Sequence, residues 1–378
     1  MASVCNIWRQ AFSLAILTFV LAGCAGAIPQ SNPPQRSATA APPQRPYVAP
    51  PRPEPPRMVQ GPSRELEAAI QSLGRSFNGE VGIAVHDIEQ GWTVSWNGER
   101  FFPQQSVSKL WVALTVLDAV DRGQLNLNQN VRVTQDDFVV FHQPMRSQVG
   151  AGGYQTTLAY LLEQAMTRSD NLANDKMLWI AGGPDAVRSF FSRNDLEGLR
   201  FGPGERLLQS GIAGMEWQQR YSIGRRFYTA RANVPASVRR SSMDRYIADP
   251  IDGATPIGMV RALGRLQRGE LLSARSTQVV LLAMQRSRTG PQRLRAGVPD
   301  SWRFGHKTGT GQNFQGRTAG YNDVGIVTAP DGRSYAVAVL IGSTRVGIPE
   351  RQRLMQAVTG QTVSHHLRRR SEMLSNRR

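Results

Sequence analysis

The sequence predicts an α/β fold in which a lobe built around a β-sheet packs against an all-helical lobe, with a ligand cleft between the two lobes. Three observations lead to this expectation. Strand-like segments occur near both ends of the folded body, at residues 81–96 and 303–341. The region between them, residues 106–286, is dominated by helical patterns. Hydrophobic residues make up 40% of the 378 positions, which is enough apolar material for a sizeable core.

The first part of the folded body is expected to combine a helix with a hairpin. Pro62-Ser63 is a helix-start signal, and an amphipathic pattern follows it. Two runs of alternating apolar and polar residues flank the turn Glu89-Gln90-Gly91, as in a β-hairpin. An apolar-rich helix closed by Gly123 comes next. The expected ranges are 64–77 for the first helix, 81–86 and 92–96 for the strands, and 106–122 for the second helix.

The rest of the body continues with helices and then returns to strands. Helical patterns occur near 157–167, 172–180, 184–193, 255–268 and 273–286. Strands are expected at 303–307, 320–328 and 334–341, and a last helix at 349–359. Because the strands come from both ends of the chain, distant segments must combine in one sheet, against which the helical middle packs. The predicted domain spans residues 63–361.

The start of the chain has the features of an export signal. Arg9 precedes a short apolar run, residues 11–22, which is typical of a cleavable signal peptide rather than a membrane-spanning helix. The tetrad Leu21-Ala22-Gly23-Cys24 resembles the bacterial lipobox, which implies removal of a signal peptide, residues 1–23, and lipid attachment to Cys24. An ordinary signal peptide that happens to contain a cysteine is the alternative.

Residues 24–62 are expected to form a linker that begins with the lipidated Cys24. The part from 25 to 62 contains 12 prolines in 38 residues and few large apolar side chains. Such a segment cannot bury enough surface to fold, and its prolines favour an extended conformation. We therefore expect an exported protein on the periplasmic side of the cell envelope, held on the membrane by its lipid.

The charge balance and the chain's end exclude several classes of site. The net charge is +17, but the arginines are scattered, so attraction to anionic envelope polymers or lipid head groups is expected and nucleic-acid binding is not. The two cysteines, Cys5 and Cys24, leave the body without a cysteine-based metal site, and no metal or cofactor is predicted. Residues 362–378 are expected to be a frayed, solvated basic tail, with His365-His366 as surface residues.

Ser106 and Lys109 form the first candidate catalytic motif, Ser-x-x-Lys, at the head of the second predicted helix. At positions i and i+3 their side chains share one helical face within hydrogen-bond reach. A serine hydroxyl is a weak nucleophile until a base takes its proton, and a partly desolvated lysine can do so. The spacing is common by chance, so a helix cap beside a surface lysine is the alternative.

Two more motifs follow in order. Ser169-Asp170-Asn171 is a polar turn, and Lys307-Thr308-Gly309 ends a strand-like segment whose glycines would let a backbone N–H approach a ligand closely. Ser-x-x-Lys, Ser-Asp-Asn and Lys-Thr-Gly in this order are the motifs of class A β-lactamases and penicillin-binding proteins. From about residue 64 to residue 359, the chain therefore resembles the class A β-lactamase group of penicillin-recognising serine hydrolases.

The resemblance implies an active site between the lobes and a role for each matching residue. Ser106 would be the acylated nucleophile, and Lys109 would help to remove its proton. The backbone N–H groups of Ser106 and Thr310 would form the oxyanion hole. Ser169, held by Lys307, would pass a proton to the leaving nitrogen. The substrate-binding residues that it implies are Asn171, Thr308, Gly309, Thr310 and Gln209.

Glu205 would hold the water that hydrolyses the acyl-enzyme, because Glu205–Gln209 matches the family's Glu-x-x-Leu-Asn element. A surface acid flanked by arginine is the alternative. Gln209 stands where asparagine is usual, and a misplacement of about 1 Å can cost on the order of a hundredfold in rate. The stretch 210–253 is longer than the family's connection. It is either a surface insertion or a border of the cleft that recognises a larger anionic ligand, such as a peptidoglycan fragment.

The function that these residues favour is a serine β-lactamase acting on β-lactam antibiotics. A D-Ala-D-Ala peptidase or another hydrolase acting on peptidoglycan stem peptides keeps the same nucleophile and is the main alternative. A penicillin-binding protein that deacylates slowly, or a module that binds without turnover, is a further one. The sequence does not predict an oligomeric state.

Overall fold

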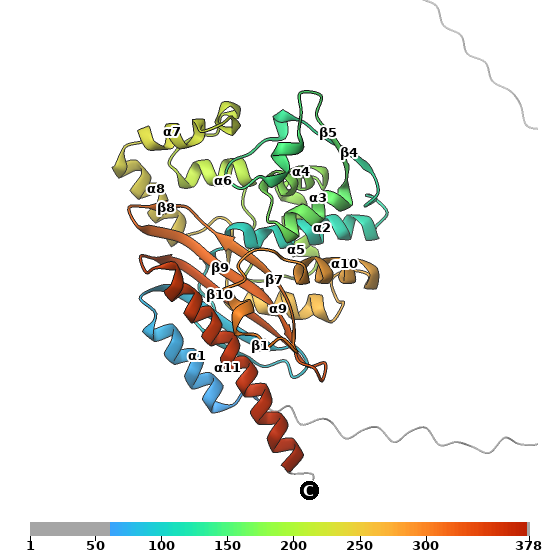
Figure 1. Cartoon of the computed structure of the whole chain (residues 1–378), viewed down its shortest axis with the longest axis vertical. Helices are drawn as coiled ribbons and strands as arrows, with labels where there is room; N and C mark the ends of the chain where they lie inside the picture. Colours follow the sequence, from blue (N-terminus) through green and yellow to red (C-terminus); the bar gives the residue numbers. More distant parts are fainter. Residues whose placement is uncertain (1–60, 376–378) are drawn as a thin grey trace, which may run out of the picture. The chain divides into compact units, whose positions relative to one another are not determined.

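A six-stranded antiparallel sheet lies at the centre of the part of the protein that the computed structural model describes, residues 61–375 (Figure 1). Its strands are β1 (Gly79–Asp87), β2 (Thr93–Trp96), β7 (Arg303–Thr310), β8 (Asn313–Phe314), β9 (Arg317–Thr328) and β10 (Ser334–Thr344). Their order is β2-β1-β10-β9-β7, and β8 pairs with β9. Strand β1 pairs with β10, with Ile83 opposite Val339. The sheet thus unites both ends of the folded body, as the sequence predicts.

Helices cover both faces of the sheet. Because successive residues of a strand point to opposite sides, neighbouring residues of β1 pack against different helices. Ile83 of β1 shares an apolar cluster with side chains of α1 (Arg64–Ser76) and α11 (Ile348–Ser375). Its neighbour Ala84 belongs to the cluster on the other face, which includes α9 (Pro256–Gln267). The side chains of the central strands β1, β9 and β10 are therefore buried along most of their length on both faces of the sheet.

The helical lobe is built around α2 (Lys109–Asp121), which is apolar on nearly all sides and almost entirely buried. Its neighbours are α3 (Leu158–Thr167), α4 (Asn171–Ile180), α5 (Pro184–Arg193) and α10 (Ala274–Gln285). A small strand pair, β4 (Asn130–Val133) with β5 (Tyr154–Thr157), completes it, and a second pair, β3 (Phe102–Pro103) with β6 (Gly253–Ala254), lies against the central sheet. The prediction of a sheet lobe packed on a helical lobe is confirmed.

The stretch 210–253 is a folded part of the domain. It contributes the end of α6 (Glu205–Ile212) and two further helices, α7 (Arg226–Asn233) and α8 (Ala236–Ala248). Tyr246 of α8 packs with apolar residues of α6, and Phe227 of α7 packs with Val140 and Ala213. Figure 1 shows α7 and α8 beside α6, close to β8. This placement brings the stretch to the mouth of the site described below.

The expectation of a frayed tail from residue 362 is wrong, because α11 continues to Ser375. Val363, His365 and His366 are buried. The His365 ring lies 5.3 Å from the Trp92 ring, and the His366 ring lies 4.9 Å from the Trp302 ring. The two histidines act as aromatic core residues on the inner side of the helix, which the basic composition of the segment hides.

We expect a chain that ends at residue 361 to be much less stable than one that ends at Arg370. The shorter chain lacks Val363, His365 and His366 and exposes the indoles of Trp92 and Trp302 that they cover. Burial of one large apolar side chain is worth roughly 1.5–3 kcal/mol, so the free energy of unfolding should fall by about 3 kcal/mol or more. Urea denaturation of both chains measures the difference. Equal midpoints would show that the end of α11 contributes nothing.

Within residues 61–375, no helix combines the length and the apolar character needed to cross a bilayer. Three predictions fall outside the described residues: the signal peptide at residues 1–23, the lipidation residue Cys24, and the linker up to residue 60.

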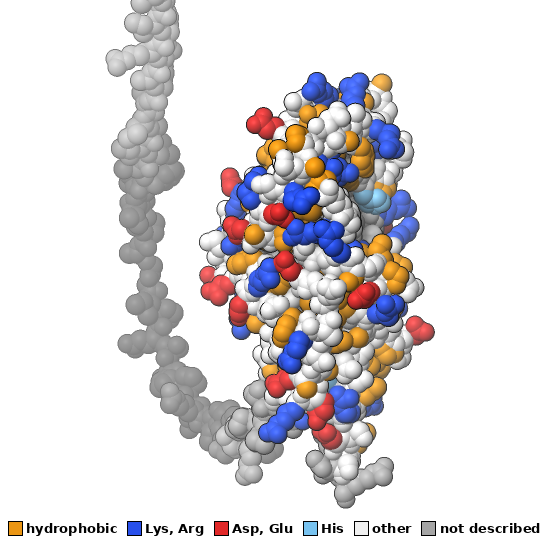
Figure 2. Space-filling view, turned by 90° about the vertical axis from the view of Figure 1, so that its left-hand side faces the viewer, with side chains coloured by type: hydrophobic (Ala, Val, Ile, Leu, Met, Phe, Trp, Pro, Cys, Tyr) orange, Lys and Arg blue, Asp and Glu red, His pale blue; other side chains and the backbone are white. Residues whose placement is uncertain are grey.

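On the face shown in Figure 2, basic side chains are spread from end to end and interspersed with acidic ones.

Candidate active site

Ser106 lies in a 3-10 turn, Gln105–Ser108, that leads directly into α2, rather than in the α-helix that the sequence predicts. The i, i+3 contact is present all the same, and the Lys109 ammonium donates to the Ser106 hydroxyl at 2.6 Å. Lys109 is buried, whereas Ser106 faces the cavity. Burial lowers the pKa of Lys109, while Glu205 and Asp170 act in the opposite direction. The Ser106 hydroxyl therefore lies beside a lysine whose neutral form, which can accept a proton, is favoured by burial.

Ser169 and Lys307 form a second hydroxyl–ammonium pair. Ser169 follows α3 with a left-handed backbone, φ 58°, which turns its side chain toward the sheet edge. Lys307 extends from β7 and donates to the Ser169 hydroxyl at 2.8 Å and to the carbonyl of Thr308 at 3.1 Å. Its pKa lies well below its ordinary value because the ammonium is buried and because Lys109 and Arg293 are nearby cations. Ser169 belongs to the helical lobe and Lys307 to the sheet lobe, so this hydrogen bond joins the two lobes.

Asn171, the first residue of α4, links the lysine to the acid. Its side-chain oxygen accepts from Lys109 at 2.7 Å, and its amide donates to Glu205 at 2.7 Å and to the Val140 carbonyl at 2.9 Å. Glu205 begins α6, where its backbone N–H donates to Asp175. Burial raises the pKa of Glu205 to about 7, against the opposing effect of Lys109. The alternative of a surface acid does not hold for Glu205, which lines the cavity.

Gln209 lies one helical turn after Glu205, and both the nitrogen and the oxygen of its side-chain amide make hydrogen bonds. Its nitrogen donates to the side chain of Gln105 at 3.1 Å, and its oxygen accepts from Gln312 at 3.0 Å. Gln105 has a left-handed backbone, φ 55°, immediately before Ser106. The longer glutamine side chain thus connects α6 to Gln105, which precedes Ser106, and to the segment that follows β7.

The Lys-Thr-Gly motif and the residues after it lie on the edge strand β7. The Thr308 hydroxyl is 2.7 Å from that of Thr289, and the Thr310 hydroxyl accepts from Arg293 at 2.7 Å. Gly309 is buried, and a Cβ at this position would lie 2.3 Å from the carbonyl oxygen of Gln104. The close approach that Gly309 permits in this structure is to the chain itself, whereas Gly311 lines the cavity. A close approach of these glycines to a ligand stays a prediction.

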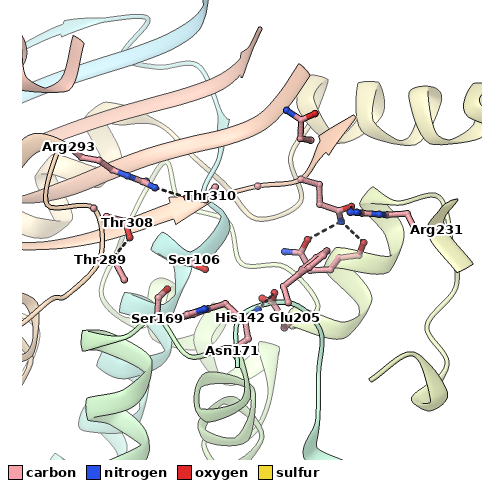
Figure 3. Close-up of a pocket in the computed structure, with 16 residues that line it drawn as sticks. Ser106, His142, Ser169, Asn171, Glu205, Arg231, Thr289, Arg293, Thr308 and Thr310 are labelled. Atoms are coloured by element: carbon pink, nitrogen blue, oxygen red, sulfur yellow. Dashed lines mark hydrogen bonds between the residues drawn. The ribbon is translucent and has the colours of Figure 1, made fainter. Parts of the chain in front are cut away.

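These residues surround a cavity of about 560 Å³ (Figure 3). The predicted residues that line it are Ser106, Ser169, Asn171, Glu205, Gln209, Thr308 and Thr310. Lys109, Lys307 and Gly309 are buried behind its wall. The structure thus places Lys109 against the Ser106 hydroxyl, Lys307 against the Ser169 hydroxyl, and Glu205 at the wall of the same cavity. A pocket of this size suits a drug-sized ligand.

Several lining residues escape the sequence analysis, among them Phe141, His142, Arg231 and Arg293. Arg293 precedes β7 and donates to the carbonyl of Gly309 at 2.9 Å, besides its bond to Thr310. It places a second cation beside Lys307 at one end of the cavity. No local motif marks these residues, because they belong to loops and to the stretch 210–253 and are brought to the site by packing.

Comparisons with known proteins agree with this arrangement. Residues 65–366 match the beta-lactamase enzyme family. Beta-lactamase VEB-1 of Pseudomonas aeruginosa is 23% identical over 302 residues, which cover 80% of this chain and 90% of VEB-1. The extended-spectrum beta-lactamase PER-1 of the same organism is 27% identical over 281 residues, covering 73% and 79%. The crystal structure of a beta-lactamase from Chitinophaga pinensis DSM 2588 is similar with a TM-score of 0.65 and 27% identity, covering 79% of this chain and 97% of that one.

Proposed function

Because the chain belongs to the beta-lactamase enzyme family, we propose that it is a serine β-lactamase that opens the β-lactam ring through an ester on Ser106. The observation that carries the proposal is one continuous hydrogen-bonded path. It runs from the Ser106 hydroxyl to Lys109, from Lys109 to Asn171, and from Asn171 to Glu205. A nucleophile, a base beside it and a second base for water are the groups that two-step hydrolysis needs.

In the first step, the Ser106 oxygen attacks the lactam carbonyl carbon while Lys109 accepts the hydroxyl proton. The ring C–N bond breaks, an ester forms on Ser106, and the leaving nitrogen takes a proton from the Ser169 hydroxyl. Lys307 holds that hydroxyl at 2.8 Å and replaces the proton it gives up. The backbone N–H groups of Ser106 and Thr310 would stabilise the oxyanion. The substrate carboxylate would bind at Thr308 and Thr310, next to the cations of Lys307 and Arg293.

In the second step, a water molecule attacks the ester carbonyl while Glu205 takes one of its protons. The ester C–O bond breaks, and the Ser106 oxygen takes its proton back from Lys109. The proton held by Glu205 passes to solvent and one from solvent restores Lys307, which leaves the ring-opened acid and free enzyme. The hydrogen bond from Asn171 orients the Glu205 carboxylate toward the same cavity that Ser106 faces. A carboxyl with a pKa near 7 is a suitable general base at neutral pH.

Purified protein mixed with several penicillins and cephalosporins tests the proposal. We expect catalytic turnover of at least one of them, seen as loss of the lactam absorbance over many enzyme equivalents. A Ser106→Ala variant should show none, because the nucleophile is missing.

The alternatives give different results in the same experiment. If the lactams label Ser106 stoichiometrically and stay bound, the protein is a slowly deacylating penicillin-binding protein. If the protein instead releases D-alanine from a stem-peptide mimic and leaves lactams intact, it is a peptidase. Either result would overturn the β-lactamase proposal.

A further inference from the structure

The cavity has a cation at the end away from Arg293, and this cation is Arg231 of α7 (Figure 3). Its guanidinium donates to the side-chain oxygen of Gln312 at 2.9 Å. It also lies over three aromatic rings, 5.4 Å from the centre of Tyr228, 5.7 Å from Phe141 and 5.9 Å from Phe227. The amide and the rings hold the planar group in place at the wall of the cavity.

Packing fixes the helix that carries this arginine. Phe227, four residues before Arg231, is fully buried and meets the Phe141 ring edge-on at 5.2 Å. Its cluster also contains Val140, whose carbonyl receives the bond from Asn171. The loop around residues 140–142 is thus held by α7 on one side and by the catalytic residues on the other. The position of Arg231 relative to Ser106 is therefore built into the fold.

Arg231 makes no ion pair with any residue between 61 and 375, although it is half-buried. Arg333, another partly buried arginine, is paired with the carboxylate of Asp87. The buried Arg293 and Arg351 bond instead to carbonyl or hydroxyl oxygens, so Arg231 shares with them the lack of an anionic partner, but it lies at the far end of the cavity from Arg293. Burial lowers the pKa of Arg231, which reflects a cation that has lost water without gaining an anion. Glu205 is the one carboxylate among the residues that line the cavity, and it is bonded to Asn171. The anion that would complement Arg231 is absent from the described chain.

We infer that Arg231 is a specificity residue that binds a second carboxylate, carried by the acyl side chain of the β-lactam. The inference rests on the proposed function. On the proposed function, the ring carboxylate would lie at Thr308, Thr310 and Arg293, and the lactam carbonyl would lie at Ser106. The acyl side chain then extends to the remaining end of the cavity, where Gln209, Gln312 and Arg231 lie. Phe141 offers an apolar face for the rest of that side chain.

Benzylpenicillin and its α-carboxy derivative, carbenicillin, test this inference because they differ only by the side-chain carboxylate. We expect Arg231→Gln to lower kcat/KM for carbenicillin by about 10- to 100-fold, as for the loss of a hydrogen bond to a charged group. The value for benzylpenicillin should change less than about threefold. Arg231→Lys should restore part of the preference, and added salt should weaken it in the wild type. Arg226→Gln is the matched control, since Arg226 is exposed on the same helix and does not line the cavity.

An equal loss on both penicillins would show that Arg231 only supports the fold, and no loss on either would show that it is idle. Both results overturn the inference while the proposed hydrolysis stands. If the wild type acylates but does not turn over, the second-order rate of Ser106 acylation gives the same comparison between the two penicillins. The inference then succeeds or fails independently of deacylation.

Discussion

A Glu205→Gln variant mixed with benzylpenicillin is expected to accumulate as a covalent adduct on Ser106. Glutamine can still accept the hydrogen bond from Asn171, but it cannot take a proton from water. Loss of a general base typically costs about 10²- to 10⁴-fold, so steady-state turnover should fall by that factor. Intact mass measured seconds after mixing should show one added penicillin per chain. Unchanged turnover would show that Glu205 does not activate the water.

The same carboxyl sets the expected pH dependence of the wild type. A base with a pKa of about 7 is protonated below that pH and active above it. The deacylation rate should therefore rise as pH increases through about 7 and then level off. Glu205→Gln should lack this rising limb. A wild-type rate that is flat between pH 5 and 8 would assign water activation to a group other than Glu205.

Replacement of Lys109 by methionine is expected to slow acylation by about 10²- to 10⁴-fold. Methionine fills much of the buried space, but it leaves Ser106 without the base that lies 2.6 Å from its oxygen. Stopped-flow labelling of Ser106 by a fluorescent penicillin measures the step directly. Lys176→Met is the matched control, because Lys176 pairs with Asp137 and has no hydrogen bond to Ser106, Asn171 or Ser169. Equal labelling rates for the two variants would contradict the assignment.

Comparing Lys109→Met with Glu205→Gln shows which of the two residues removes the Ser106 proton during acylation. Lys109 and Glu205 are both connected to the nucleophile, one directly and the other through Asn171. If Glu205→Gln is labelled nearly as fast as the wild type and Lys109→Met is not, Lys109 alone removes the Ser106 proton. Comparable losses in both would assign the step to the connected pair.

Local signals predict the elements whose ends and faces are marked in the sequence. Helix α5 spans Pro184–Arg193 as expected, because proline opens it and its apolar residues share one face. Helix α7 escapes prediction since Phe227 is its one buried residue and most of its surface is polar. Such a helix depends on tertiary packing, which a local pattern does not reveal. The end of α11 is missed for the opposite reason, as histidines stand where apolar residues would mark the buried side.

The residues of the candidate site likewise fall into those that short sequence motifs mark and those that only the fold reveals. Ser106, Lys109, Ser169 and Lys307 stand out because they occur in short motifs in a definite order, and in the structure their polar atoms meet in pairs. Arg231 and Arg293 do not stand out in a chain that is rich in arginine. Their positions follow from how distant loops pack around the cavity. The sequence therefore reveals the groups of the proposed chemistry, whereas the groups proposed to select the substrate require the fold.

Pairing of β1 with β10 means that the central sheet of the domain can form only after its last strand has been made. Until Ser334–Thr344 has left the ribosome, the nascent polypeptide lacks the strand that separates β1 from β9. The central sheet cannot close before then, and α11, which covers one of its faces, is made after β10. We therefore expect the growing chain to remain loose for most of its translation. Its unpaired apolar strands would be prone to aggregate during that interval.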